Sequence, residues 1–449
     1  MRRIFRLTFL AALAPFFLSS GLRAAEVQKY PEWAKNAVIY EVNIRQHTVE
    51  GTFQALEKDL PRLKNLGVDI LWLMPINPIG LKNRKGKLGS YYSVMDYKKI
   101  NPEYGTEEDF KNLVKAAHKQ GLKLIVDWVA NHTAWDNPWL AEHPDWYQKD
   151  NTGKFLSPYD WTDVVSLNYT NKELRAAMTA AMEYWVRTCD IDGYRCDVAG
   201  LVPVDFWEEA RAALDKIKPM FMLAEDEDKT ELCNKAFDMN YGWRMHHLMH
   251  QVAKAEMRAD TLIKYQTEFL KTFPSRAIKM NFTTNHDENS WNGTVEEKFG
   301  LKPEVFSVLC YTFPGMPLLY SGQEAKLNKR LRFFEKDTID WKNTDLIPFY
   351  QKLNKLRHET KALWSPPFGG NFKAVGSYTR GSILSYSLEK DGNVVFVILN
   401  LGGTPCSVVP GNDIPVGKFR EYFSGRTMNL AKDTKFSLQG WSYQVFISE

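Results

Sequence analysis

The chain has 449 residues, of which 44% are hydrophobic and 25% are charged, and these values exclude a disordered or fibrous protein. The formal charge of +4 is small for this length and gives no basic surface for nucleic acid. The length suits about three domains of ordinary size, or one large domain with a smaller module.

The first residues have the pattern of a signal peptide. Three arginines within the first six residues precede an apolar run over 7–18, and Ala24 and Ala25 offer a cleavage point. The apolar run is too short to span a bilayer as a helix. We therefore expect residues 1–24 to be removed from an exported chain, periplasmic or secreted, whose mature form has no membrane span.

The stretch after the signal peptide alternates short apolar runs with helical periodicity, which predicts parallel strands joined by helices. One such helix is expected over 107–120, where Phe110, Leu113, Val114 and Ala117 recur every three or four residues. Eight strand and helix pairs predict an α/β fold, a (β/α)8 TIM barrel. The expected strands are 38–42, 70–73, 124–128, 193–196, 221–224, 236–239, 278–282 and 317–320.

Two segments depart from the barrel pattern. Residues 134–167 are rich in Trp, Asp, Pro and Tyr and predict a small subdomain inserted after the third strand. The barrel then covers 25–133 and 168–364. From 365 to 449, Gly-rich turns and alternating β-branched runs predict a C-terminal antiparallel β-sandwich domain.

Four acidic residues lie at the ends of expected strands, where TIM barrels place catalytic groups. They are Asp127, Asp197, Glu225 and Asp287. A retaining glycosidase needs two carboxyl groups about 5 to 5.5 Å apart, and neighbouring strands lie about 4.8 Å apart. Asp197 and Glu225 follow the fourth and fifth strands and make the best pair of nucleophile and acid. Helix capping is the alternative reading of such residues.

The four acidic residues lie within four short sequence motifs that occur in a fixed order along the chain. They are DWVANH at 127–132, GYRCD at 193–197, MLAE at 222–225 and NHD at 285–287. In this order, on strands three, four, five and seven, they resemble the motifs of the α-amylase family, glycoside hydrolase family 13. The resemblance covers residues 37–357. It implies a glycosidase that cleaves α-glucosidic bonds in starch-type glucans and maltooligosaccharides.

The resemblance also implies a role for each matched residue. Asp197 would be the nucleophile, Glu225 the acid and then the base, and Asp287 the carboxylate that grips sugar hydroxyls. Arg195, two residues before Asp197 and on the same face of the strand, is expected to lower the pKa of the nucleophile and keep it ionised. The residues expected to hold the cleaved sugar are Tyr92, His132, Arg195 and His286.

The chain departs from the family pattern just after the nucleophile. Many members have Lys and His there, whereas this chain has Gly200 and Leu201, so contacts to the leaving group must differ. The same region often helps to hold calcium together with the asparagine equivalent to Asn131. No metal ligand is assigned here: the chemistry requires no cofactor, and calcium binding is left open.

Three functional questions stay open at this level. Activity on α-1,6 bonds accompanies activity on α-1,4 bonds in some relatives, and the motifs do not separate them. A transglycosylase would use the same covalent intermediate, with a sugar in place of water. A non-catalytic glucan-binding relative is the third alternative, although such proteins typically lose carboxylates that this chain keeps.

Overall fold

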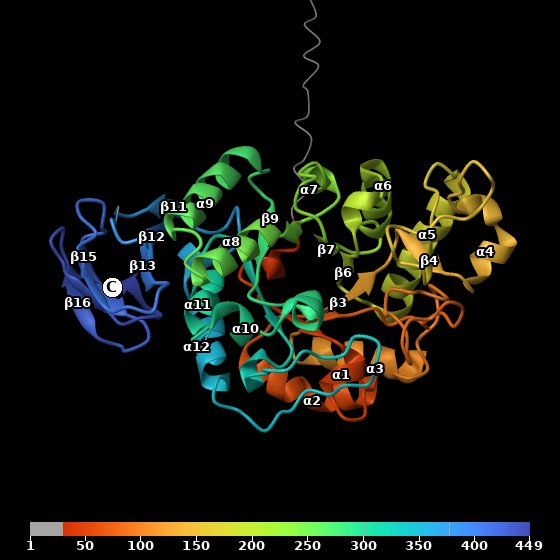
Figure 1. Ribbon diagram of the computed structural model, residues 1–449, viewed down its shortest axis with the longest axis horizontal. Helices are drawn as coiled ribbons and strands as arrows, with labels where there is room; N and C mark the ends of the chain where they lie inside the picture. The colour runs from red at the N-terminus through yellow and green to blue at the C-terminus, as the bar shows by residue number, and fades with distance from the viewer. Residues whose placement is uncertain (1–29, 301, 377) are drawn as a thin grey trace, which may run out of the picture.

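The computed structural model describes residues 30–300, 302–376 and 378–449 (Figure 1). Eight parallel strands close a barrel in the order β1-β10-β9-β8-β7-β6-β3-β2. Their bounds are Ile39–Val42 (β1), Ile70–Leu73 (β2), Lys123–Trp128 (β3), Gly193–Cys196 (β6), Phe221–Ala224 (β7), Met239–Tyr241 (β8), Ile278–Asn281 (β9) and Met316–Tyr320 (β10). The predicted (β/α)8 barrel is confirmed. The predicted signal peptide, 1–24, lies outside the described residues.

Seven expected strands agree with the structure to within one residue at each end. The sixth was placed wrongly, at 236–239 instead of Met239–Tyr241. Ala236 and Phe237 instead follow the short helix α7, and the Phe237 N–H donates to the Leu232 carbonyl at 3.0 Å. The error arises because a short buried apolar run has the same composition in a strand and at a helix end.

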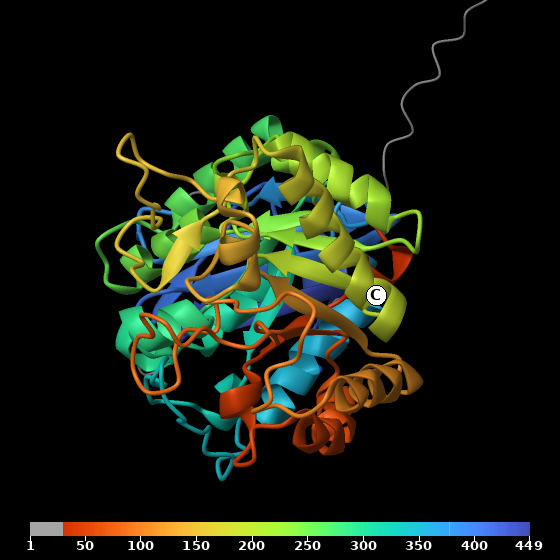
Figure 2. The same cartoon turned by 90° about the vertical axis from the view of Figure 1, so that its right-hand side faces the viewer.

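Helices surround the barrel (Figures 1 and 2). The helix expected at 107–120 is α3, and it begins with a capping box between Thr106 and Asp109. The helices are α1 (Ile44–His47), α2 (Phe53–Leu66), α3 (Glu107–Lys119), α4 (Pro138–Glu142), α5 (Lys172–Cys189), α6 (Val204–Leu214), α7 (Leu232–Lys235), α8 (Trp243–Ala253), α9 (Asp260–Thr272), α10 (Val295–Phe299), α11 (Glu304–Thr312) and α12 (Ile347–Glu359). Among the described residues, no helix combines the length and apolarity needed to cross a membrane.

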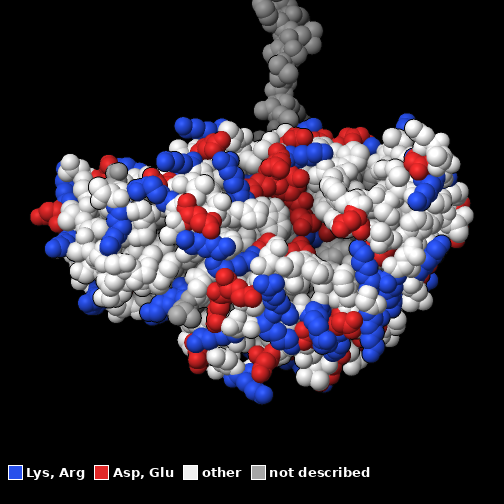
Figure 3. All heavy atoms as spheres, in the orientation of Figure 1, with Lys and Arg blue, Asp and Glu red and all other residues white. Residues whose placement is uncertain are grey.

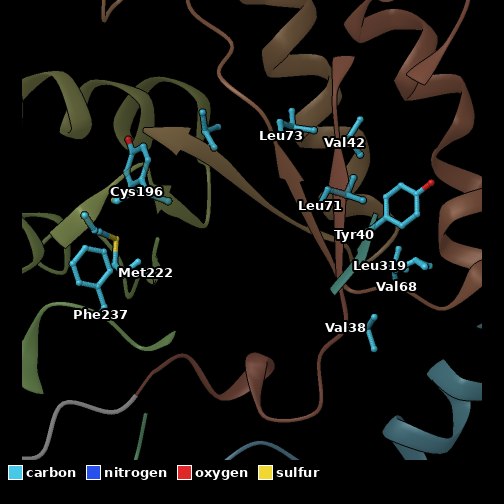
Figure 4. Packing of buried hydrophobic residues seen from close by; sticks show 14 of the residues in the cluster. Val38, Tyr40, Val42, Val68, Leu71, Leu73, Cys196, Met222, Phe237 and Leu319 are labelled. Carbon is cyan, nitrogen blue, oxygen red and sulfur yellow. The ribbon is translucent and has the colours of Figure 1, made fainter. Parts of the chain in front are cut away.

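The barrel strands are buried on both faces, which explains their continuous apolar sequences. Tyr40 of β1 pairs with Leu71 of β2, and Val42 pairs with Leu73. Figure 4 shows these four side chains in the layer between the strands and the helices. Ile39, Ile70 and Trp72, on the opposite face of the same two strands, belong to a second cluster inside the barrel. Each fully buried aliphatic side chain contributes about 1.5–3 kcal/mol.

Strands β6 and β7 approach each other at a glycine. Gly193 opens β6 and pairs with Phe221 of β7. A Cβ atom at Gly193 would lie 2.0 Å from the Phe221 carbonyl oxygen, so only glycine fits there without a shift of the backbone. Asp197 and Glu225 directly follow these two strands.

The insertion and the C-terminal domain lie at opposite ends of the molecule (Figure 1). The insertion contains the antiparallel pair β4 (His132–Ala134) and β5 (Val164–Ser166) together with α4. The C-terminal domain has two antiparallel sheets, as expected for this part of the chain. Their strands are β11 (Asn371–Ala374), β12 (Ile383–Lys390), β13 (Asn393–Asn400), β14 (Cys406–Val408), β15 (Gly417–Glu421), β16 (Thr427–Leu430), β17 (Phe436–Leu438) and β18 (Ser442–Ser448).

Candidate active site

The four acidic residues singled out in the sequence come together at the carboxyl end of the barrel. Asp127 lies in β3, Asp197 and Glu225 directly follow β6 and β7, and Asp287 lies beyond β9. Strands β3, β6 and β7 are consecutive neighbours in the barrel. In Figure 3, acidic side chains gather beside a hollow over the region where Figure 1 draws these strands.

One buried guanidinium connects three of these carboxyl groups. Arg195 has no solvent exposure, and its Nη1 lies 2.9 Å from Asp127 Oδ1 and 3.1 Å from Asp197 Oδ1. Its Nη2 lies 2.8 Å from Glu225 Oε2. Because both Asp197 and Glu225 contact the same side chain, their carboxyl groups lie on the same side of the barrel wall.

The backbone after Asp197 also serves Glu225. Val198 has φ +37°, a left-handed conformation that is unfavourable for a β-branched residue. In this conformation the Val198 N–H donates to Glu225 Oε2 at 2.9 Å. Backbone strain of this kind persists where the surroundings enforce it, and here it fixes the orientation of the acid.

Arg195 was expected to keep the pKa of Asp197 low, but other influences on this carboxyl group are stronger. Burial and the neighbouring Glu225 carboxylate raise the pKa of Asp197 well above its usual range, although Arg195 acts in the lowering direction as predicted. Burial also raises the pKa of Asp127 to about 6. Three carboxyl groups share one guanidinium, so full ionisation would leave excess negative charge in a buried site. Burial and this crowding of carboxyl groups therefore favour the protonated forms of Asp127 and Asp197.

The expected sugar-binding residues surround these carboxyl groups. The Tyr92 hydroxyl lies 3.1 Å from Asp127 Oδ2 and 2.7 Å from His286 Nε2, and the two rings are stacked with centroids 5.6 Å apart. His286 Nε2 also lies 3.3 Å from Asp287 Oδ2. Burial lowers the pKa of His132 to about 3, so this ring is neutral.

A cavity of about 450 Å³ opens above the carboxyl groups. Six of the seven expected site residues line it, and Arg195 lies beneath them. The expected residues in the lining are Tyr92, His132, Asp197, Glu225, His286 and Asp287. Aromatic side chains complete the lining and offer flat faces on which sugar rings can stack. They are Trp161, Trp291, Phe333 and Phe334.

The aromatic residues of the insertion have two roles: one lines the cavity, and most of the others pack within the module. Trp161 lines the cavity. Trp146 and Tyr147 are buried, and Trp146 packs against Trp139 with ring centroids 5.2 Å apart. Trp135 donates its indole N–H to the Thr162 carbonyl at 3.0 Å. The aromatic content of this module therefore mostly builds its own small core.

Sequence reasoning missed one buried carboxylate. Glu41 in β1 is fully buried, and its Oε1 lies 2.5 Å from His286 Nδ1. Burial disfavours a charged imidazole, but the Asp287 and Glu41 carboxylates outweigh it and raise the pKa of His286 to about 9. His286 is thus a second cation beside Arg195. The sequence signal that could have revealed Glu41 was an acidic residue within the otherwise apolar first strand.

Comparison with known proteins identifies the family to which this chain belongs. The family model of the α-amylase catalytic domain matches residues 28–152 and 141–346. The chain belongs to the α-amylase family of glycosidases. Among solved structures, an α-amylase from Lactobacillus plantarum is 31% identical with a TM-score of 0.83, covering 93% of this chain and 100% of that one.

Two further relatives extend the comparison. A noncanonic maltogenic α-amylase, AmyB from Thermotoga neapolitana, is 30% identical with a TM-score of 0.85, covering 93% of this chain and 99% of that one. Alpha-amylase MalA of Haloarcula japonica is 26% identical over 89% of this chain. This chain spans 61% of the length of MalA.

The departure from the α-amylase family pattern at Gly200 has a structural counterpart. A Cβ atom at Gly200 would lie 2.0 Å from Asp226 Oδ2, so the Asp226 carboxylate occupies the space that a side chain would enter. Asn131, the other residue of interest for calcium, has its amide nitrogen 3.1 Å from His132 Nδ1. Residues 30–300, 302–376 and 378–449 contain no group of three or more acidic, His or Cys side chains suited to a metal.

The contact between Glu41 and His286 generates a prediction. We expect Glu41→Gln to lower the pKa of His286, because it removes one of the two anions that keep the ring charged. The wild-type imidazolium persists up to about pH 9, so in the variant the charge is lost at lower pH. The KM for maltooligosaccharide should therefore begin to rise at lower pH than in the wild type.

NMR titration of the imidazole, together with KM as a function of pH, checks this expectation. Glu256→Gln, at an exposed position on the surface, is the matched control and should change neither measurement. An unchanged titration of His286 in Glu41→Gln would contradict the assigned role of Glu41.

Proposed function

We propose that the chain is a retaining glycoside hydrolase that cleaves α-1,4-glucosidic bonds in starch-type glucans and maltooligosaccharides. The observation that carries the proposal is the guanidinium of Arg195, which contacts both Asp197 and Glu225 at the base of the cavity. Similarity to a maltogenic α-amylase supports maltooligosaccharides as substrates. Analysis of the products from pullulan and isomaltose tests whether the enzyme also cleaves α-1,6 bonds.

In the first proposed step, Asp197 attacks the anomeric carbon while Glu225 gives its proton to the departing glycosidic oxygen. The carbon–oxygen bond of the substrate breaks, and a covalent ester forms between the sugar and Asp197. In the second step, Glu225 takes a proton from water, and the water oxygen displaces Asp197. Two inversions at the same carbon retain its α configuration.

The buried charges serve these steps in different ways. The Arg195 cation stabilises the carboxylate that Asp197 presents and the one that Glu225 becomes after it gives up its proton. The Asp287 side chain is about one-third exposed and lies beside His286, where both can bind hydroxyls of the distorted ring. Tyr92 and Phe333 are stacked with ring centroids 6.2 Å apart and offer an aromatic surface beside that ring.

Two variants separate the roles of Asp197 and Glu225. Asp197→Ala should lose at least about a thousandfold in turnover on every substrate, because no nucleophile remains. Glu225→Gln should lose a similar factor on maltooligosaccharides but retain a rapid first-turnover burst of fluoride from α-maltosyl fluoride, because fluoride needs no acid to depart, whereas the second step still lacks its base. Stopped assays with both substrates measure this difference.

The control for this pair is Asp433→Ala, at an exposed position in the C-terminal domain, which should match the wild type. If Asp197→Ala retains activity on either substrate, the nucleophile lies elsewhere.

The proposed chemistry uses carboxyl groups of the chain and requires no cofactor. We expect turnover after EDTA treatment and gel filtration to stay within about twofold of the untreated enzyme, and added calcium to leave it unchanged. Loss of activity that calcium alone restores would show that a metal site supports the fold or the cleft.

We also propose that the chain is exported, as a periplasmic or secreted enzyme, on the evidence of its first 24 residues. Mass spectrometry of the protein purified from cells should find a mature N-terminus near Ala25. Recovery of the chain with its first residues intact would argue against export by this route.

A further inference from the structure

The connection between β2 and α3, residues 74–106, carries Tyr92 and touches the inserted subdomain. Lys85 Nζ lies 3.2 Å from Asp163 Oδ1. The Ser93 hydroxyl donates to the Asp163 carbonyl at 3.1 Å, and the Leu81 N–H donates to Asp136 Oδ2 at 2.7 Å. These contacts join the connection to both ends of the insertion.

The same connection touches the segment that follows β10. The Leu88 N–H donates to the Phe334 carbonyl at 2.9 Å, and the Lys87 N–H donates to Glu335 Oε1 at 3.1 Å. Gly86 has φ +62°, and a Cβ atom there would lie 2.4 Å from Phe334 Cβ. A glycine is therefore needed at this point for the two segments to approach. Figures 1 and 2 draw the red-orange connection beside the gold insertion and the cyan segment.

Together these contacts form a continuous wall, which we call the β2 wall, defined by residues 81–90, 163 and 333–335. The wall belongs to the cavity itself, because Lys85, Asp163, Phe333 and Phe334 all line it. The Asp163 side chain is 5% exposed and that of Lys85 is 34% exposed. A carboxylate buried to this degree needs its partner, so the ion pair holds the wall in place.

The order of strands shows which side of the cavity the wall closes. In the closed barrel, β7 lies directly opposite β1, and β2 and β10 flank β1. Glu225 follows β7, whereas the wall is built on the segments after β2 and β10, with Asp163 from the insertion. The β2 wall therefore stands across the barrel mouth from the general acid.

The orientation of the glycosidic bond between Asp197 and Glu225 determines which part of the glucan lies toward the β2 wall. Glu225 protonates the leaving oxygen, so the part of the glucan that departs extends toward the Glu225 side. The sugar that Asp197 attacks carries its remaining chain on O4, in the direction of the non-reducing end. A chain that extends away from Glu225 therefore points toward the β2 wall.

We propose that the β2 wall, fastened by the ion pair of Lys85 and Asp163, restricts the enzyme to glucans that enter by their non-reducing end. The enzyme then acts from chain ends and releases a short product of constant length. Lys85 is a specificity-determining residue for the mode of attack. This inference rests on the proposed glycosidase function and adds the end of the glucan from which the enzyme acts.

Two substrates test the proposal with the full mature chain. One is a p-nitrophenyl maltoheptaoside with a free non-reducing end, and the other is the same compound capped there by a 4,6-ethylidene group. Chromatography of the p-nitrophenyl fragments gives the rate and the cleaved bond. We expect the open compound to be cleaved at least about a hundredfold faster than the capped one, with one short product from the open end.

Variants assign this discrimination to the wall. Lys85→Ala should reduce the ratio of the two rates about tenfold, because the wall loses its ion pair. Lys98→Ala is the matched control: this residue is exposed in the same connection and lies outside the cavity lining, so the ratio should stay at the wild-type value.

Cleavage of both compounds by the wild type at rates within about threefold, or a ratio unchanged in Lys85→Ala, overturns the proposal. Cleavage of neither compound is a different result, because it refutes the glycosidase function on which the proposal rests.

Discussion

A single guanidinium, fully buried among three carboxyl groups, is the interaction on which the site depends. Arg195 contacts Asp127, Asp197 and Glu225 with both terminal nitrogens. A cation without exposure is costly unless it is paired, and carboxylates in the same place are costly without the cation. Each group is therefore tolerated because the others are present, and the barrel strands that carry them are fixed in their relative positions.

The second cation is also paired with carboxylates. His286 lies between Glu41, which reaches it from inside the barrel, and Asp287, which faces the cavity. The two cations stay below the number of nearby carboxyl groups, so the site carries excess negative charge when all of them ionise. An oxocarbenium-like transition state is positive, and this excess stabilises it at the point where its charge develops.

Much of this could be read from the sequence because the information was local. Strands buried on both faces show as apolar runs, and acids at their ends mark the mouth of a barrel. Three of the four acids found by that rule, Asp197, Glu225 and Asp287, line the cavity, whereas Tyr92, His132 and His286 were expected from the family motifs. The misplaced sixth strand shows its limit, since Ala236 and Phe237 are buried at a helix end as well as they would be in a strand.

The features that the sequence did not predict depend on contacts between residues that are far apart in the sequence. Glu41 and His286 are far apart in sequence, and only the closed barrel brings β1 beside the segment after β9. The net direction of the Asp197 pKa required the burial and the position of Glu225, which motifs do not contain. The contact of Lys85 with Asp163 joins two loops without regular pattern, and no periodicity reports such pairs.

The glycine that opens β6 has a consequence for how such an enzyme diversifies. Gly193 sets the close approach of β6 and β7 at the end of the strands far from the substrate. The spacing of the two strands that carry the reacting groups thus depends in part on a residue outside the lining of the cavity. Loops at the mouth are free to lengthen, shorten or exchange partners during evolution, and new preferences arise while the reaction itself is inherited intact.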